Sequence, residues 1–179
     1  MPATYTVRKA EASDIEAISA VHVQSWRETY PGIMPQQRID GMSVESSSRH
    51  WQAVISEGFT FLVAETEGRV VGFASGGNNY EYKNCETGLG NACDCELEAL
   101  YLLKEFQGRG IGKALVHRFA EIMKQEKKHT MMIWVAEKNP STGFYEAIGG
   151  ELVDRKTLVV CKVPVPVLAY RFRLGNWPV

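Results

Sequence analysis

Residues 96–115 read ELEALYLLKEFQGRGIGKAL, and this stretch decides the fold of the chain. Its order predicts a strand, a short turn, a glycine-rich loop and the first turn of a helix. Glycine lets a backbone approach an anion closely, and the start of a helix offers unpaired N–H groups and the positive end of the dipole. Because Arg109 and Lys113 add positive charge beside the glycines, the layout predicts a phosphate site.

Other interpretations of these glycines fit less well. A Walker loop ends in Gly-Lys-Ser/Thr, but Ala114 follows Lys113, and Gln107 stands where the first glycine should be. A dinucleotide fingerprint has the spacing Gly-x-Gly-x-x-Gly. Whether the motif is started at Gly108 or at Gly110, no glycine stands at its third position. A surface turn whose glycines serve only geometry remains open.

The spacing Gln107-x-x-Gly110-x-Gly112 resembles the Gln/Arg-x-x-Gly-x-Gly/Ala motif of the GNAT superfamily of N-acetyltransferases. Lys104 departs from the family, which often has a proline there. Residues 134–150, WVAEKNPSTGFYEAIGG, resemble its strand, Asn loop, Phe-Tyr helix and closing glycine. Residues 20–35 are similar to a bacterial branch of small GNAT enzymes, so the resemblance covers most of the chain in the right order.

The resemblance implies direct transfer of the acetyl group of acetyl-CoA to an amine of a small molecule or peptide, through a ternary complex. Asn139 either bonds the pantetheine arm or caps the next helix, since asparagine before proline also forms caps and turns. The other residues expected to hold the co-substrate are those of the strand and the glycine loop: Leu100, Tyr101, Leu102, Gln107, Gly108, Arg109, Gly110, Ile111, Gly112 and Lys113.

Acetyl transfer requires a base for the amine, whose pKa is about 10.4, and a proton for the leaving thiolate. The resemblance assigns the proton to Tyr145, which matches the family tyrosine close to the sulfur of CoA. Glu96, eleven residues before Gln107, is the first candidate for the base. Glu98 is the second, because alternate residues of a strand share a face. A water chain instead of a dedicated base, or ion pairing of either carboxylate, remains open.

The sequence indicates much less about the amine acceptor than about the acetyl donor. Trp26, Tyr30 and Trp51 lie in the N-terminal helical region, which shapes the acceptor pocket in this family, and aromatic walls suit an amine. Packing in the core explains them equally well. We expect His22 and His117 to be structural or solvated.

Composition limits the partners. The chain has 179 residues, 45% of them hydrophobic and 23% charged, and a net charge of −1. These values favour one domain, residues 1–179, without a nucleic-acid or membrane partner. With no signal peptide in sight, we expect a cytoplasmic protein, and a homodimer is possible because dimers are frequent in the family. Cys85, Cys93 and Cys95 lack the spacing of zinc ligands, so we expect free thiols and no metal.

The pattern of elements predicts an α+β, three-layer fold with a mixed, mostly antiparallel sheet flanked by helices. Ser13-x-x-Glu16 predicts a capping box, and Pro164 and Pro166 are expected between the last two strands. Strands are expected at 4–9, 59–65, 69–76, 96–103, 130–136, 151–163 and 167–174, and helices from Ile15, at 44–55, 110–125 and 140–148.

Two other functions stay open. A module that senses CoA without catalysis needs the phosphate loop, but neither Tyr145 nor Glu96. An enzyme or toxin that acetylates a macromolecule needs an open groove, of which residues 78–94 are a candidate wall.

Overall fold

The computed structural model describes residues 4–78 and 93–176. Its strands form one seven-stranded sheet in the order β1-β2-β3-β4-β5-β7-β6. All neighbours are antiparallel except β4 and β5, which are parallel. The strands are β1 (Thr6–Lys9), β2 (Thr60–Thr66), β3 (Arg69–Asn78), β4 (Cys95–Leu102), β5 (Thr130–Ala136), β6 (Glu151–Val160) and β7 (Val163–Arg173).

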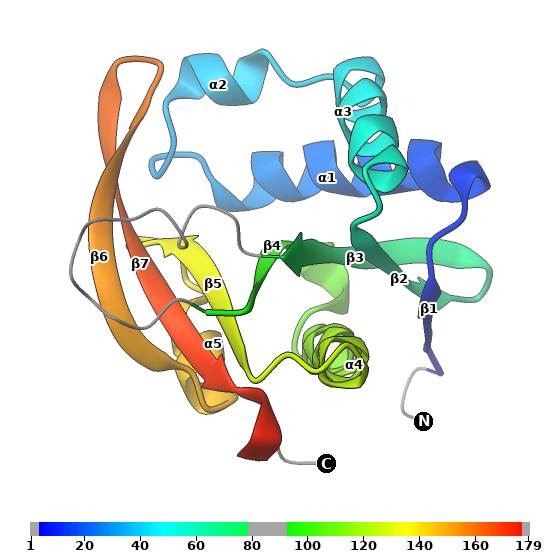
Figure 1. The fold of residues 1–179 in the computed structure, drawn as a ribbon. Helices are drawn as coiled ribbons and strands as arrows, with labels where there is room; N and C mark the ends of the chain where they lie inside the picture. The colour runs from blue at the N-terminus through cyan, green and yellow to red at the C-terminus, as the bar shows by residue number, and fades with distance from the viewer. Residues whose placement is uncertain (1–3, 79–92, 177–179) are drawn as a thin grey trace.

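Helices cover both faces of this sheet (Figure 1). Three lie on one face and two on the other, so the expected three-layer α+β fold is confirmed. The first group is α1 (Ile15–Thr29), α2 (Gln36–Asp40) and α3 (Val44–Ser56). The second group is α4 (Ile111–Gln125) and α5 (Thr142–Ala147).

Alternation along β2 shows how the sheet separates two cores. Phe61 and Val63 pack under α1 and α3, whereas Leu62 and Ala64 pack against α4. Successive side chains of a strand point to opposite faces, so a continuous apolar run serves both layers. Both cores are therefore closed by one sheet, and this fixes the helices relative to the strands.

The ladder between β4 and β5 is short. Only Cys95 pairs with Met131 and Glu96 with Met132, although β4 continues to Leu102 and β5 to Ala136. Beyond these two pairs the strands diverge, and within the described ranges no other strand pairs with their facing edges. The sheet is therefore open in its middle, on the side where the glycine loop follows β4.

A β-bulge lies in β4 beside this opening. Ser75 of β3 pairs with Ala99, and the next residue, Gly76, pairs with Leu97, so Glu98 is the extra residue. A bulge kinks a strand and re-aims side chains. At Gly76 an added Cβ would lie 2.1 Å from the Glu96 carbonyl oxygen, so only glycine admits this close approach.

Two local predictions are wrong. The capping box is made not by Ser13 and Glu16 but by Glu11 and Asp14, around a 3₁₀ turn that precedes α1. The Asp14 carboxylate accepts the Glu11 N–H at 2.8 Å and also pairs with Arg8 at 2.7 Å. One acidic group that satisfies both an amide and a guanidinium outcompetes a serine hydroxyl.

The second concerns Pro164 and Pro166, which lie inside β7 rather than between strands. The turn is Cys161-Lys162, with both φ positive at 48° and 65°. This part of β7 pairs with β6 but lies beyond the end of β5, so the missing proline N–H groups break no ladder.

Candidate active site

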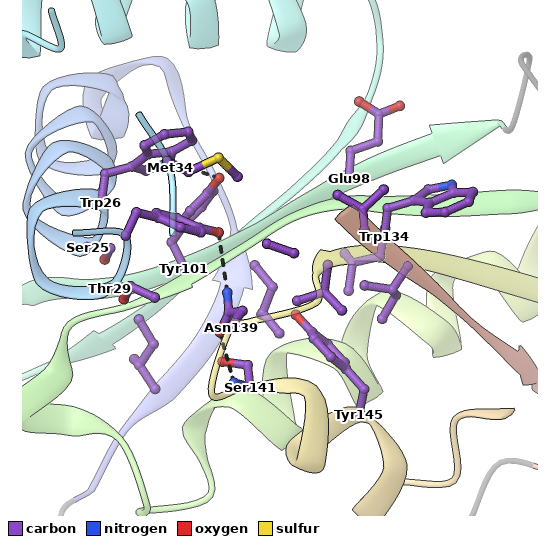
Figure 2. A pocket seen from close by; sticks show the side chains of 18 of the residues that line it. Ser25, Trp26, Thr29, Met34, Glu98, Tyr101, Trp134, Asn139, Ser141 and Tyr145 are labelled. Carbon is purple, nitrogen blue, oxygen red and sulfur yellow. Dashed lines mark hydrogen bonds between the residues drawn. The ribbon is translucent and has the colours of Figure 1, made fainter. Parts of the chain in front are cut away.

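A cavity of 210 Å³ lies in the opening between β4 and β5, and we call it the cleft cavity (Figure 2). Strand residues from both sides of the opening line it, together with α1, the loop after β5 and the start of α5. Figure 2 shows Trp26 and Tyr145 entering from opposite sides, with Glu98 at the far end. The lining includes Ser25, Trp26, Tyr30, Glu98, Leu100, Tyr101, Leu102, Gln107, Asn139 and Tyr145.

The glycine loop leads from β4 into α4. Gly108 and Gly110 have positive φ of 72° and 83°, a region that side chains with a Cβ rarely adopt. The first helical hydrogen bond runs from the Ala114 N–H to the Gly110 carbonyl, so the amides of residues 111–113 have no acceptor inside the helix. The loop therefore presents bare amides at the positive end of α4.

Side chains of the loop hold it in shape. The Gln107 amide donates to the Leu102 carbonyl at 3.1 Å, which ties the loop to the end of β4. Arg109 donates to the Glu105 carbonyl at 2.8 Å and lies over the Phe106 ring. Of the loop residues predicted to hold the co-substrate, only Gln107 lines the cleft cavity itself, and the others extend along the route from the cavity to α4.

Tyr145 lies on α5 and is buried, with 6% of its surface exposed. Its ring stacks on Tyr170 and meets Phe144 edge to face, which fixes the direction of the hydroxyl. Burial, reinforced by Tyr101, raises the pKa of Tyr145. The hydroxyl of this residue, which lines the cleft cavity, is therefore protonated at neutral pH.

The two glutamates of β4 lie in different places. Glu98, at the bulge, is exposed and lines the cleft cavity. Glu96 is half-buried, pairs with Gly77 and Met132 in the sheet, and is not among the lining residues. The sequence could not separate these carboxylates, because it does not show where the bulge falls.

Asn139 forms a turn immediately before α5. Its side-chain oxygen accepts the N–H of Ser141, which is itself the N-cap of the helix, at 2.8 Å. Its amide nitrogen approaches the Tyr30 hydroxyl at 3.5 Å, which links this turn to the C-terminal end of α1. Burial raises the pKa of Tyr30, so its hydroxyl stays protonated. Asn139 therefore shapes the turn and also lines the cleft cavity.

Trp26 and Tyr101 form the wall on the α1 side. The indole N–H of Trp26 donates to the Tyr101 hydroxyl at 3.1 Å, and its ring lies 4.5 Å from that of Tyr30. Tyr101 packs with Phe73 below, so its side chain belongs to the core under α1 and α3. The structure therefore brings together Trp26, Tyr30, Glu98, Tyr101 and Tyr145.

Sequence reasoning missed two features of this site. Ser25 is buried, lines the cleft cavity, and its hydroxyl has no hydrogen-bond partner among the described residues. Trp134 of β5 lines the opposite wall, with the Lys156 ammonium 4.1 Å from the centre of its ring. An isolated serine in a helix carries no sequence signal, whereas a tryptophan within an apolar strand, as Trp134 is in β5, is a usable one.

Cys93, Cys95 and Cys161 are not among the residues that line this cavity. Within residues 4–78 and 93–176 no group of three or more His, Cys, Asp or Glu side chains is arranged to hold a metal ion. Burial raises the pKa of the Cys93 thiol, and that of Cys95 to about 12. Cys85 and the proposed wall at 78–94 lie, apart from their ends, outside the described residues. No helix in the described part of the chain has the length and hydropathy to cross a bilayer.

Similarity to known proteins agrees with this geometry. The model of the acetyltransferase (GNAT) family matches residues 18–149. YuaI, an uncharacterised N-acetyltransferase of Bacillus subtilis (strain 168), is 38% identical over 158 residues, which cover 88% of this chain and 87% of that protein. A probable N-acetyltransferase of Mycobacterium tuberculosis is 26% identical over 181 residues, or 95% and 94% of the two chains.

Solved structures share the fold. The PaiA N-acetyltransferase of Thermoplasma acidophilum, in complex with coenzyme A, has a TM-score of 0.69 at 22% identity and covers 94% of this chain and 99% of its own. A GCN5-related N-acetyltransferase of Rhodopseudomonas palustris has a TM-score of 0.73 at 16% identity, with coverage of 97% and 98%.

A mixed sheet opened beside a glycine loop, with a buried tyrosine in the opening, defines an acyltransferase of this fold. The chain belongs to the GNAT family of acetyltransferases. The family and the enzyme class predicted from the sequence, an N-acetyltransferase, are thereby confirmed.

Proposed function

We propose that this protein transfers the acetyl group of acetyl-CoA directly to an amine while both are bound. The observation that carries the proposal is the opening between β4 and β5, with Tyr145 buried in its wall. Two structural neighbours support the choice of donor, since one is in complex with coenzyme A and one, YncA of Salmonella typhimurium, has acetyl-CoA as its cofactor.

The residues present fit such a donor. In the described part of the chain, the edge of β4 over Leu100, Tyr101 and Leu102 has no strand partner on the β5 side, so its backbone groups are available to the amides of the pantetheine arm. The loop from Gln107 to Lys113 supplies amides and two cationic side chains for the pyrophosphate. Asn139 lines the cavity from the turn between β5 and α5.

Acetyl-CoA supplies the acetyl group as a thioester. During transfer a bond forms between the amine nitrogen and the acetyl carbon, the carbon–sulfur bond breaks, and the sulfur needs a proton. The Tyr145 hydroxyl donates it, because burial keeps that group protonated. Glu98 receives the proton of the amine, directly or through water, because its carboxylate lines the cavity. Backbone N–H groups of the β4 edge stabilise the developing oxyanion.

A CoA sensor is the second candidate, and it needs neither Tyr145 nor Glu98. Both side chains line the cleft cavity, which favours catalysis. Thiol release in the presence of acetyl-CoA and a panel of amines separates the two. Turnover that depends on the amine identifies the enzyme, and binding without turnover for any amine identifies the sensor.

The first measurement is the melting temperature with and without acetyl-CoA. A ligand at about a hundred times its Kd stabilises the folded state by about 2.7 kcal/mol. For a chain of this size the expected rise is about 5–10 °C. Adenine alone should not produce it. No rise at millimolar acetyl-CoA would contradict the proposal, because the glycine loop would then be only a turn.

A further inference from the structure

A second cavity adjoins the first on the α1–α3 face of the sheet. Its volume is 410 Å³, and it shares Trp26, Glu98 and Tyr101 with the cleft cavity. The rest of its wall comes from α1, α2 and α3. We call it the helical cavity. Since Glu98 belongs to both, a molecule in the helical cavity meets the proposed base at the boundary with the cleft.

An exposed guanidinium, that of Arg38 in α2, lines the helical cavity. It lies over the Trp26 ring, 5.2 Å from its centre. Within residues 4–78 and 93–176 no side chain or backbone group forms an ion pair or a hydrogen bond with this guanidinium. Stacking on the indole orients the planar guanidinium, and a guanidinium so oriented matches a carboxylate or phosphate in two parallel hydrogen bonds. The Arg38 guanidinium is therefore available to a negatively charged group of a bound molecule.

His22 adds a neutral donor to the same cavity. It is 8% exposed, and both the Trp51 indole N–H, at 3.2 Å, and the Ser47 hydroxyl, at 2.8 Å, reach its Nδ1. An indole nitrogen only donates, so Nδ1 must be an acceptor, and the ring proton lies on Nε2.

The charge state of His22 agrees with this tautomer. Burial, and after it His50 and Arg38, lowers the pKa of His22 to about 4. The ring is thus uncharged at neutral pH. Its Nε2–H has no hydrogen-bond acceptor among the described residues, so it can donate a hydrogen bond to an oxygen atom of a bound molecule. Arg38 and His22 together make a pair of donors, one charged and one neutral.

We infer that the acceptor is a primary amine that carries a carboxylate, as an amino acid does. Its carboxylate binds the Arg38 guanidinium and the His22 Nε2–H, and its amino group faces Glu98 at the entrance to the cleft. Trp26, Trp51 and Tyr101 enclose its carbon chain. This inference rests on the proposed function. A polyamine is disfavoured, because a second ammonium would lie beside Arg38.

The test is the rate of thiol release from acetyl-CoA with three matched sets of amines. The first holds the common amino acids, β-alanine and γ-aminobutyrate. The second holds their amides and decarboxylated amines, and the third holds spermidine and short peptides. We expect the best acceptor to be an amino acid, with a kcat/KM at least about ten-fold above its own amide.

Arg38→Met should then raise the KM of that amino acid by about ten-fold or more and abolish its advantage over the amide. Its kcat and the KM of acetyl-CoA should change little, because Arg38 touches neither reacting group. Arg38→Lys should restore part of the preference. Arg49→Met, an exposed arginine of α3 outside this cavity, is the matched control and should leave the preference unchanged.

Three results overturn the inference: a best acceptor without a carboxylate, an Arg38→Met variant that keeps the preference, or no acetylation of any amino acid by protein that binds acetyl-CoA. The rise in melting temperature with acetyl-CoA reports on the proposed function separately. A protein that binds the donor and acetylates only spermidine would therefore disprove the inference and leave the acetyltransferase intact.

Discussion

The two adjoining cavities are built from different material. The cleft cavity is an interruption in the sheet, and backbone edges and a glycine loop form most of its recognition surface. The helical cavity is made by side chains of three helices, among them His22, Arg38 and Trp51. A site that binds its ligand through backbone groups requires glycines at fixed spacing, and this spacing is visible in the sequence as a motif. A site that binds through side chains uses residues from distant parts of the chain, which form no motif. The sequence therefore indicates the proposed donor but not the acceptor.

The largest effect is expected from Tyr145→Phe, which removes one hydroxyl from the cleft cavity and leaves the helical cavity unchanged. We expect kcat to fall by about a hundred-fold, because the leaving sulfur loses its proton donor. The rise in melting temperature with acetyl-CoA should persist. Tyr170→Phe is the control, since Tyr170 stacks on Tyr145 but its hydroxyl bonds Glu146. Equal turnover of the two variants would remove Tyr145 from the mechanism.

The second test compares the two glutamates of β4. Glu98→Gln should lower kcat/KM for the amine by about ten-fold to a hundred-fold, because Glu98 lies where the two cavities meet. Glu96→Gln, two residues earlier in the same strand, should have a much smaller effect. Steady-state rates at saturating acetyl-CoA measure both. A larger loss of kcat/KM for Glu96→Gln would identify Glu96, the first candidate from the sequence, as the base. The base would then not be a residue that lines either cavity.

The third test uses pH, because only the helical cavity contains a buried imidazole. The folded-state pKa of His22, about 4, lies below its ordinary value of 6.5. The unfolded chain therefore binds the proton first, and stability falls as pH drops below 6.5. From pH 7 to pH 5 the loss is about 2 kcal/mol.

Urea unfolding of wild type and His22→Gln between pH 7 and pH 5 measures this loss. The variant should lose less stability over this range than the wild type. Parallel curves for wild type and His22→Gln would mean that His22 charges as easily in the folded chain as in the unfolded one.

The smallest expected effect concerns the loop. Gly110→Ala forces a side chain into a φ of 83° at the start of α4, whereas Gly68→Ala does the same at 75° in the β2–β3 turn, away from both cavities. Each should cost about 1–2 kcal/mol of stability. Only Gly110→Ala should also raise the KM of acetyl-CoA, by about ten-fold. A normal KM would show that α4 does not hold the pyrophosphate.

Much of the fold could be predicted because it depends on local periodicity. The order of strands and helices, the mixed sheet and the start of α4 within one residue follow from alternation and from glycine spacing. The short helix α2 was missed, because five residues carry no periodic signal. The prolines of β7 were misplaced because their tolerance depends on β5 ending first, which is a tertiary fact.

The site was predictable only in part, for a related reason. Tyr145 and Gln107 lie in motifs, and both line the cleft cavity. Arg38 and His22 lie 16 residues apart in ordinary helical sequence, and only the packing of α1, α2 and α3 brings them to one cavity. The bulge at Glu98 depends on pairing with β3, so a single strand does not reveal it.

The two-pair ladder between β4 and β5 has a consequence for the protein outside its reaction. A sheet that is open in the middle has four edges instead of two, and an unpaired edge invites pairing with another chain. Ordinary sheets shield their outer strands, but here the inner edges must stay bare to receive a substrate. A donor that fills the opening also protects those edges from aggregation. We therefore expect added acetyl-CoA to slow aggregation of the folded protein.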